Sequence, residues 1–311
     1  MLNAMDKVPV LFVFFNREKT AIRSFEKIKK YQPKKLYLAS DGPRASKQGE
    51  ADIVLGLREK ILSMVDWGCD VQTRFLSENK GCGPNVYESI SWLFTNEEKG
   101  IIIEDDVMAG DSFFTFMESM LETYKDDRRV GMISSFNPFQ SYKSEYSYLF
   151  SRYYVCWGWA SWRDRWKNMD YAMSWRSTPL KESIIKNRGK DVFRWNWQLN
   201  YIDHGYVSSW DWQWYFSLSA QNQLCIFPAV NLATNIGNDK DAIHNSKATN
   251  ITFESKELEM PLKHSPYIVP DATFENLLYK RDSNLRMKLN RRIPRKVKDF
   301  KNKVLGLVKM K

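Results

Sequence analysis

Residues 100–107 read Gly-Ile-Ile-Ile-Glu-Asp-Asp-Val, and this stretch decides the expected fold. Its three consecutive isoleucines predict a strand that is buried on both faces, as in a parallel sheet covered by helices. Glu104, Asp105 and Asp106 follow where this strand leaves the sheet, the edge at which open α/β sheets bind ligands. Adjacent carboxylates repel one another unless a cation compensates them, and their oxygens suit Mg²⁺ or Mn²⁺ shared with a substrate phosphate. The alternative is a solvated acidic turn after a core strand.

The first 135 residues alternate strand-like and helix-like segments. Strands are expected at residues 8–15, 36–40, 71–76, 101–103 and 130–134, and helices at 18–31, 50–66, from Pro84 onward and from Asp111 or Ser112 onward. Repeated βα units predict an α/β fold with a mostly parallel, doubly wound central sheet. The sequence has no Gly-x-Gly-x-x-Gly after the first strand and no phosphate-binding Gly-Lys-Ser/Thr loop, which argues against a dinucleotide-fold dehydrogenase and a P-loop NTPase.

The pattern changes after residue 135. Residues 136–200 are aromatic and irregular, and an expected helix at 211–221, a strand at 224–227 and a polar loop at 231–246 follow. We interpret residues 1–265 as one domain, with a nucleotide half at about 1–135 and an acceptor half at about 136–265, and residues 266–311 as a basic extension. Most of the twelve Trp residues lie in the acceptor half, where indoles serve as core or as platforms for sugar rings. The spacing of Trp162 and Trp166 predicts one buried helix face.

The formal net charge of +10 belongs to the C-terminal tail. Residues 285–311 hold eleven Lys or Arg and a single Asp, and the rest of the chain is balanced at 36 basic and 36 acidic side chains. Apolar residues at helical spacing after Pro294 predict a basic amphipathic helix, which suits an anionic membrane surface. A solvated helix docked on the domain is the alternative. Nucleic acid, which also attracts such a tail, is not expected as a partner.

Cysteine use and the N-terminus bear on the compartment. The four cysteines form no Cys-x-x-Cys pair, which favours a reducing environment. The first residues lack a signal-peptide pattern, and no apolar run reaches transmembrane length. Together with the tail, these features predict a cytoplasmic protein held peripherally on the inner membrane face.

The order of these features along the chain resembles that of a known enzyme family. A βαβ half ends in Glu-Asp-Asp, and Cys156-Trp157-Gly158, Trp210-Asp211-Trp212 and a loop from Asn235 to His244 follow in turn. Over about residues 8–246 this order is similar to nucleotide-sugar glycosyltransferases of the GT-A fold. The likeness is to the N-acetylglucosaminyltransferase I type and to bacterial family-2-like, haemolysin-related transferases. It implies a Rossmann-like, nucleotide-diphospho-sugar transferase fold.

For the acidic triplet, the resemblance implies separate roles. Asp106, the last acid, would bind Mn²⁺ (or Mg²⁺), which bridges the donor diphosphate and neutralises charge on the leaving group. Glu104 and Asp105 would hold the ribose and the hydroxyls of the donor sugar. The alternative for either residue is a role in orienting loops.

Four further residues are expected at the donor nucleotide. Arg17 follows the first strand, where the family has an arginine near the phosphates, and a guanidinium fork suits a diphosphate. Asp41 matches an acid that contacts the base or ribose, although a turn that continues Gly-Pro explains an aspartate by itself. Lys80 lies in a glycine-containing loop that resembles a donor loop. His244 lies in a loop that resembles one closing over the donor, and we expect it first as a phosphate contact.

The acceptor side is expected around Trp157, Gly158 and Trp210, because the resemblance implies a Gly-Trp segment below the donor sugar. Asp211 matches the family's catalytic base, the carboxylate that takes the proton of the acceptor hydroxyl in a single displacement. An aspartate before a helix also serves as an N-cap, and the two roles are compatible.

The sequence therefore predicts a metal-dependent, inverting glycosyltransferase that uses a UDP-sugar and acts on a surface-glycan or lipid-linked acceptor. One rival is a sugar-nucleotide pyrophosphorylase, but such enzymes carry a glycine-rich loop after the first strand, where this chain reads Phe-Asn-Arg-Glu-Lys at residues 15–19. The other rival is a non-enzymatic membrane-binding protein, which would not need Asp105, Asp106 and Asp211 together.

Overall fold

The computed structural model of the chain describes residues 7–237 and 253–290. Its contacts divide the chain into one compact unit, Met1–Asp271, and a second, Ala272–Lys311, and each is described by itself. The domain boundary expected after residue 265 stays a prediction.

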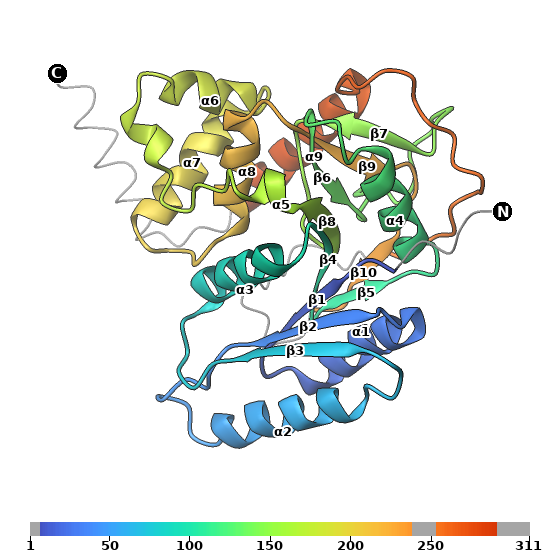
Figure 1. Ribbon diagram of the computed structural model, residues 1–311. Helices are drawn as coiled ribbons and strands as arrows, with labels where there is room; N and C mark the ends of the chain where they lie inside the picture. Colours follow the sequence, from blue (N-terminus) through green and yellow to red (C-terminus); the bar gives the residue numbers. More distant parts are fainter. Residues whose placement is uncertain (1–6, 238–252, 291–311) are drawn as a thin grey trace. The chain divides into compact units, whose positions relative to one another are not determined.

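A large sheet forms the centre of the first unit (Figure 1), with strand order β3-β2-β1-β4-β8-β6-β9-β7. Its strands are β1 (Val10–Phe14), β2 (Lys35–Ser40), β3 (Asp70–Phe75), β4 (Lys99–Glu104), β6 (Val130–Ser134), β7 (Tyr148–Ser151), β8 (Trp159–Trp162) and β9 (Leu224–Pro228). Strands β3, β2, β1 and β4 run parallel, as do β6 and β9, whereas β8 and β7 are antiparallel to their neighbours. The expected α/β fold with a mostly parallel central sheet is confirmed.

A small second sheet pairs β5 (Val107–Ala109) antiparallel with β10 (Ala233–Asn235). Strand β5 begins directly after Asp106, and Asn235 is the residue opposite Val107. The pairing therefore brings the chain around Asn235 to the end of β4, although the two segments are far apart in sequence.

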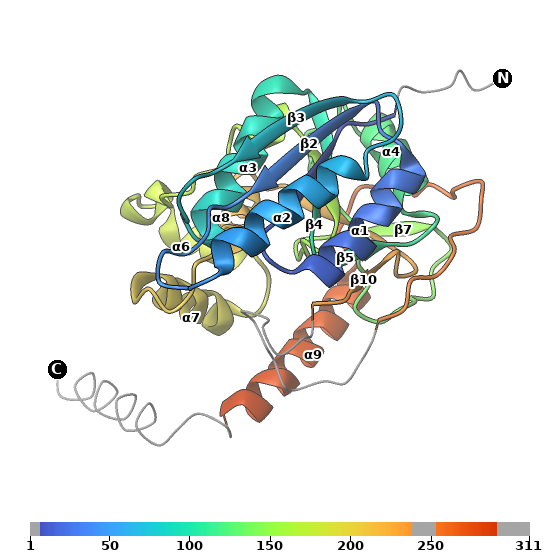
Figure 2. The same ribbon diagram turned by 90° about the horizontal axis from the view of Figure 1, so that it is seen from below.

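Helices cover both faces of the main sheet (Figures 1 and 2). They are α1 (Glu18–Tyr31), α2 (Glu50–Ser63), α3 (Cys82–Asn96), α4 (Phe113–Thr123), α5 (Arg163–Trp166), the 3-10 helix η1 (Ser174–Ser177), α6 (Lys181–Asn187), α7 (Val192–Asp203) and α8 (Asp211–Ala220). Val10, Phe12 and Phe14 of β1 join the apolar core that includes residues of α1, α2 and α4. Leu11 and Val13, between them, are buried on the opposite face.

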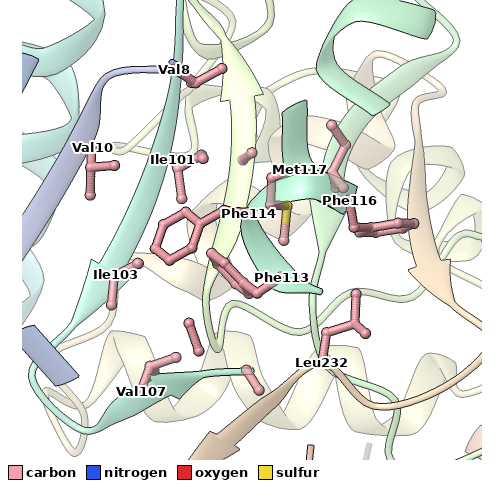
Figure 3. Packing of buried hydrophobic residues seen from close by; sticks show 14 of the residues in the cluster. Val8, Val10, Ile101, Ile103, Val107, Phe113, Phe114, Phe116, Met117 and Leu232 are labelled. Carbon is pink, nitrogen blue, oxygen red and sulfur yellow. The ribbon is translucent and has the colours of Figure 1, made fainter. Parts of the chain in front are cut away.

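Figure 3 shows the core beside the strand that carries the acidic triplet. Ile101 and Ile103 belong to this core together with Phe113 and Met117 of α4. Ile102 is fully buried but lies outside this cluster, as expected for the alternate face of a strand. The prediction of a strand buried on both faces is confirmed. Burial of each such side chain contributes about 1.5–3 kcal/mol, so the end of β4 is firmly held.

Residues 136–200 are more ordered than the sequence pattern indicates, because they contain β7, β8 and three α-helices. Strand β8 inserts antiparallel between β4 and β6. Trp162 lies in β8 and Trp166 ends the four-residue helix α5, so the expectation that they share one helix face is wrong. Both indoles are nevertheless buried. The loop expected at 231–246 includes β10 near its start.

Helix α9 (Ala272–Asn290) is the described part of the second unit. The basic amphipathic helix expected after Pro294 lies outside the described residues. No helix in residues 7–237 and 253–290 is long and apolar enough to cross a membrane.

Candidate active site

The carboxyl ends of β1 and β4 bring a basic residue onto the acidic triplet. These strands are parallel neighbours, with Val13 opposite Glu104, so the residues that follow them meet at one edge of the sheet. Arg17 donates hydrogen bonds from Nη2 to Asp105 and from Nη1 to Asp106 Oδ2, the latter at 3.2 Å. The backbone N–H of Phe15 donates to Asp105 Oδ2 at 3.3 Å. Asp105 is therefore built into the site by the turn after β1, and only 4% of its surface is exposed.

Negative charge exceeds positive charge at this strand end. Burial raises the pKa of Asp105 to about 6, and Asp106 adds to the effect although the Arg17 guanidinium opposes it. Burial, together with the charges of Asp106, Asp105 and Asp211, raises the pKa of Glu104 well above its ordinary value. Like charges and low polarity both disfavour ionised carboxyls, so binding of a cation or a proton would stabilise the cluster.

Asp211 joins the cluster from a distant part of the sequence. It is the first residue of α8, where the positive end of the helix dipole favours a carboxylate. Its Oδ1 accepts a hydrogen bond from Ser209 Oγ at 2.8 Å, and its Oδ2 accepts one from the Tyr154 hydroxyl at 3.1 Å. Burial raises the pKa of Cys82 to about 12, with further contributions from Glu104 and Asp211, because this thiol lies near both carboxylates. The N-cap position itself is Trp210, so Asp211 stands one residue inside the helix.

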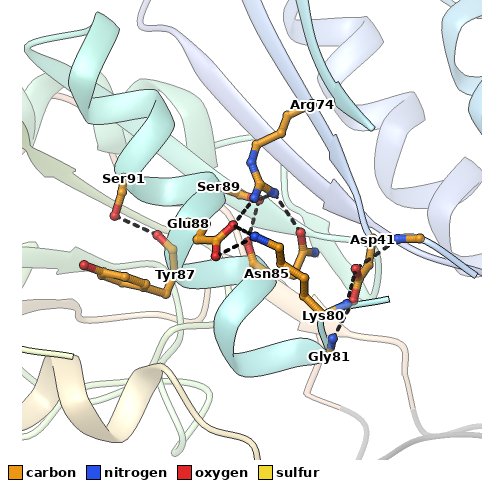
Figure 4. A network of polar contacts seen from close by, with 10 residues as sticks. Asp41, Arg74, Lys80, Gly81, Asn85, Tyr87, Glu88, Ser89 and Ser91 are labelled. Atoms are coloured by element: carbon orange, nitrogen blue, oxygen red, sulfur yellow. Dashed lines mark hydrogen bonds and ion pairs between the residues drawn. The ribbon is translucent and has the colours of Figure 1, made fainter. Parts of the chain in front are cut away.

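Asp41 organises the loop that was expected to hold the donor (Figure 4). One carboxylate oxygen accepts from the backbone N–H groups of Gly42 and Lys80, and the other accepts from that of Gly81, each at 2.9 Å. Burial raises the pKa of Asp41 although these three N–H groups act to lower it. A side chain at Gly42 would collide with the backbone of Glu78 across the loop. The structure thus gives Asp41 a loop-fixing role, and its nucleotide contact stays a prediction.

Lys80 points along the N-terminal turns of α3 (Figure 4). Its Nζ donates to the two carboxylate oxygens of Glu88 at 2.9 and 2.8 Å, and Arg74 pairs with the same carboxylate. Arg74 also donates to Asn85 Oδ1 at 2.9 Å. Contact between Lys80 and a phosphate therefore requires that it leave Glu88, and its expected phosphate role stays a prediction.

The segment that follows β10 closes against the metal-site candidate. The backbone N–H of Ile236 donates to the Asp106 carbonyl oxygen at 2.7 Å. A Cβ on Gly237 would overlap the Asp106 carboxylate, lie 2.8 Å from Asp106 Cβ and lie 3.0 Å from Arg17 Nη1. Only glycine therefore permits this approach. His244 lies outside the described residues, and its phosphate role stays a prediction.

The residues expected on the acceptor side differ in exposure and packing. Gly158 has a φ of +68°, and an added Cβ would meet Val107 Cγ1 at 3.1 Å, so this turn needs glycine. Trp157 is 37% exposed, although its ring contacts that of Phe136 with centroids 4.5 Å apart. Trp210 is 4% exposed and stacks on Trp159 at 5.6 Å, so its packing favours a core role over the expected sugar-lining role.

Two groups of residues near the site were missed by sequence reasoning. Asn16 Nδ2 and Arg44 donate to the buried Glu50 carboxylate, and hydrogen bonds from Arg44 lower the pKa of Glu50 to about 2. The sequence signal for this group was Arg44, which lies three positions after Asp41, the residue that follows β2. The other group is Tyr154 and Arg188, which lie near Asp211, and the sequence signal for Tyr154 was its position just before the Gly-Trp segment.

Arg188 is the second missed residue behind the proposed base. Its guanidinium is fully buried and packs on the rings of Tyr154 and Tyr215. Within the described part of the chain, its three side-chain nitrogens make no hydrogen bond. Burial lowers its pKa well below the ordinary value, although the nearby Tyr154 and Asp211 act in the opposite direction. No sequence pattern marks such a residue.

The described side chains contain no group of three or more His, Cys, Asp or Glu residues that could hold a metal ion by themselves. The Asp106 carboxylate is partly open, with 22% of its side chain exposed, and Glu104 is also half-buried, whereas Asp105 is buried.

Comparison with known proteins gave matches among solved structures alone. No family model matches the chain, and no curated protein matches it. A mannosyltransferase, PcManGT from Pyrobaculum calidifontis in complex with GDP-Man and Mn²⁺, has 14% identity over 51% of this chain and 45% of that chain, with a TM-score of 0.35. HddC from Yersinia pseudotuberculosis has 11% identity over 42% of this chain and 58% of that chain, with a TM-score of 0.28. The same protein complexed with GMP-PN gives 13% identity and the same TM-score of 0.28. The chain thus spans about half the length of these solved structures.

Proposed function

We propose that this chain is a metal-dependent glycosyltransferase of the GT-A type, which moves a sugar from a nucleotide donor to an acceptor hydroxyl. One observation carries the proposal. Glu104, Asp105 and Asp106 at the end of β4 share a site with Asp211 from the start of α8, and burial and mutual repulsion raise the pKa of Glu104 and Asp105. A fold gains nothing in stability from such a cluster, so the arrangement points to chemistry.

The donor end of the site is Arg17 and Asp106. Mg²⁺ and Mn²⁺ bind proteins through one or two carboxylates and complete their coordination with phosphate oxygens and water, and the partly open Asp106 carboxylate fits that pattern. When bound, such a cation would neutralise the charge that builds on the leaving nucleoside diphosphate. Arg17 already holds Asp105 and Asp106 with its two terminal nitrogens, so contact with a diphosphate would use the remaining N–H donors of its guanidinium. Lys80 and His244 are proposed as further phosphate contacts.

Asp211 is proposed as the catalytic base. Each of its oxygens accepts one hydrogen bond, from Ser209 and from Tyr154, which fixes the carboxylate and leaves further lone pairs for an acceptor hydroxyl. As that hydroxyl oxygen bonds to the anomeric carbon, its proton passes to Asp211 and the bond from the carbon to the diphosphate oxygen breaks. A single displacement of this kind inverts the anomeric centre.

The finer assignments are part of the same proposal. The donor is a UDP-sugar, and Glu104, Asp105 and Asp41 hold its sugar and nucleoside. The acceptor is a surface glycan or a lipid-linked glycan, and the basic residues 285–311 hold the enzyme on the cytoplasmic face of an anionic membrane. What supports the membrane step is the charge of that tail alone.

The test is nucleoside diphosphate release from a panel of UDP-, GDP- and dTDP-sugars, with Mn²⁺ or with EDTA. Wild-type protein should release the diphosphate from one donor in a Mn²⁺-dependent way, and Asp106→Asn should abolish release. The matched control is Asp111→Asn, because Asp111 is an exposed aspartate, paired with Lys30, five residues downstream. Absence of release from every donor, or equal loss in both variants, would contradict the proposal.

A further inference from the structure

A row of aromatic rings, two of them exposed and two half-buried, begins at the residue after the proposed base. Trp212 follows Asp211 directly, and its ring lies 6.1 Å from that of Trp197 on α7. Trp197 in turn contacts Tyr201, one helical turn further on, with ring centroids 4.0 Å apart. Tyr201 lies 5.4 Å from Tyr206 in the segment after α7. We name these four residues, Trp212, Trp197, Tyr201 and Tyr206, the aromatic row.

The aromatic row is more exposed than a second group of aromatic rings, which comes from β8, α5 and α8. Trp159, Trp166 and Trp214 pack on one another in a closed cluster and are almost fully buried. By contrast, Trp197 is 39% exposed and Tyr206 is 63% exposed. Large apolar rings gathered on a surface are uncommon on a soluble chain and mark places where something binds.

Polar groups are interleaved with these rings. Asn196 and Asn200 are exposed on the same helix, and His204 stacks on Tyr206 with ring centroids 5.4 Å apart. Asp203 pairs with Arg176 through two hydrogen bonds of 2.6 Å, so the charges beside the row are matched. A membrane-facing helix would instead carry apolar rings with an excess of cations. Rings with amide, imidazole and hydroxyl neighbours suit a ligand that has both C–H faces and hydroxyl groups.

We propose that the aromatic row is a carbohydrate-binding surface that holds successive sugar residues of the acceptor glycan and delivers its end to Asp211. Sugar rings present an apolar face of C–H groups, which stacks on indole and phenol rings, and hydroxyls that bond to amides at their rim. Trp212 is the residue after Asp211 on α8, so the row starts one residue from the proposed base, and in our proposal the end of a glycan lying along α7 is placed there. This inference rests on the proposed function, because an acceptor surface has meaning only in a transferase.

The test uses the full chain and linear hexasaccharides of glucose, mannose and N-acetylglucosamine as probes. Protein labelled with 5-fluorotryptophan is titrated with each probe, and Trp197→Phe assigns the fluorine signal of Trp197. We expect that signal to shift with at least one hexasaccharide. The Kd of that probe should rise at least about 10-fold in Trp197→Ala and in Tyr206→Ala, as for a central aromatic contact. The matched control is Tyr267→Ala, which removes an aromatic ring that is 70% exposed and lies outside the row.

Each outcome decides the question. If the Trp197 signal ignores all three probes, or if the row variants bind as the wild type does, the inference fails. It also fails if these variants lose anionic-liposome binding, or if they turn a dimer into a monomer, because the row would then serve a membrane or a second copy. Acceptor-independent diphosphate release is measured on the same samples and should be unchanged by the control Tyr267→Ala. If wild type shows no release while the probes still shift Trp197, the transferase proposal has failed and a saccharide-binding surface remains.

Discussion

Asp105→Asn tests whether the acidic cluster is as strained as its geometry indicates. Asp105 is 4% exposed, and burial beside Asp106 raises its pKa to about 6 from an ordinary 3.8. Because the folded state binds this proton more tightly than the unfolded state does, metal-free wild type should gain stability as the pH falls from 7 toward 5. With these two pKa values, linkage gives a gain of about 1.3 kcal/mol from this one carboxyl over that interval.

The assay is urea unfolding in EDTA at pH 7, 6 and 5, for wild type and for Asp105→Asn. Asn cannot titrate, and its NH₂ group faces the Phe15 N–H or Arg17 at every pH, so the contribution of the Asn side chain itself to the unfolding free energy is the same at every pH. The difference between wild type and variant should therefore move by about 1.3 kcal/mol in favour of wild type on going from pH 7 to pH 5. In Mn²⁺ this pH dependence should shrink, because a bound cation stabilises the native state by mass action and favours the ionised carboxyl.

A surface aspartate supplies the matched control. The Lys29 hydrogen bond lowers the pKa of Asp66 below its ordinary 3.8, so this carboxyl stays ionised in both states between pH 7 and 5. Asp66→Asn should therefore show a constant difference from wild type over that interval. A constant difference for Asp105→Asn as well would refute the reasoning, because it would mean that the buried carboxyl keeps an ordinary pKa in solution.

Three further variants probe the geometry of the site. Gly237→Ala should lower turnover about 100-fold in the diphosphate-release assay by displacing the Asp106 carboxylate. Its control is Gly56→Ala in helix α2, where an added Cβ would meet no neighbouring group within 4 Å, and this variant should leave turnover unchanged. Asp211→Asn should lower kcat by about 10²–10⁴-fold with little change in the donor KM, as measured by steady-state kinetics. Tyr154→Phe removes the 3.1 Å hydrogen bond to Asp211 and should lower kcat by up to about 10-fold, with donor binding by calorimetry unchanged.

Local patterns predicted the first half of the chain well, and the reason is physical. In a βα unit the strand is apolar along its length and the helix is apolar on one stripe, so residues 8–135 carry their structure in short windows. Strand β8 escaped prediction because its four residues gain their place from β4 and β6, which are distant in sequence. Because β8 was not predicted, the spacing of Trp162 and Trp166 was interpreted as one helix face, whereas Trp162 lies in a strand and Trp166 in a helix.

Some contacts of the candidate site were predictable from the sequence and others were not, depending on the kind of interaction. Charged side chains at strand ends, such as Arg17 and Asp105, were expected together and the structure joins them. The hydrogen bonds from backbone N–H groups to Asp41 were not predictable, because every non-proline residue carries that donor and no sequence pattern marks it. Exposure was likewise hidden: Trp210 and Trp212 are near neighbours in sequence, yet one is buried in a core cluster and the other is part of the aromatic row.

In the proposed enzyme, the charge of the site constrains the order in which the cation and the donor bind. One guanidinium, Arg17, faces Asp105 and Asp106, and the carboxyls of Glu104 and Asp211 lie nearby. A free nucleoside diphosphate would bring more negative charge to an edge that already holds an excess, and repulsion would oppose its entry. A divalent cation reverses that balance, since it attracts both Asp106 and the diphosphate oxygens. The donor is therefore expected to enter after the cation or together with it, and titration with the donor in EDTA should show far weaker binding than titration in Mn²⁺.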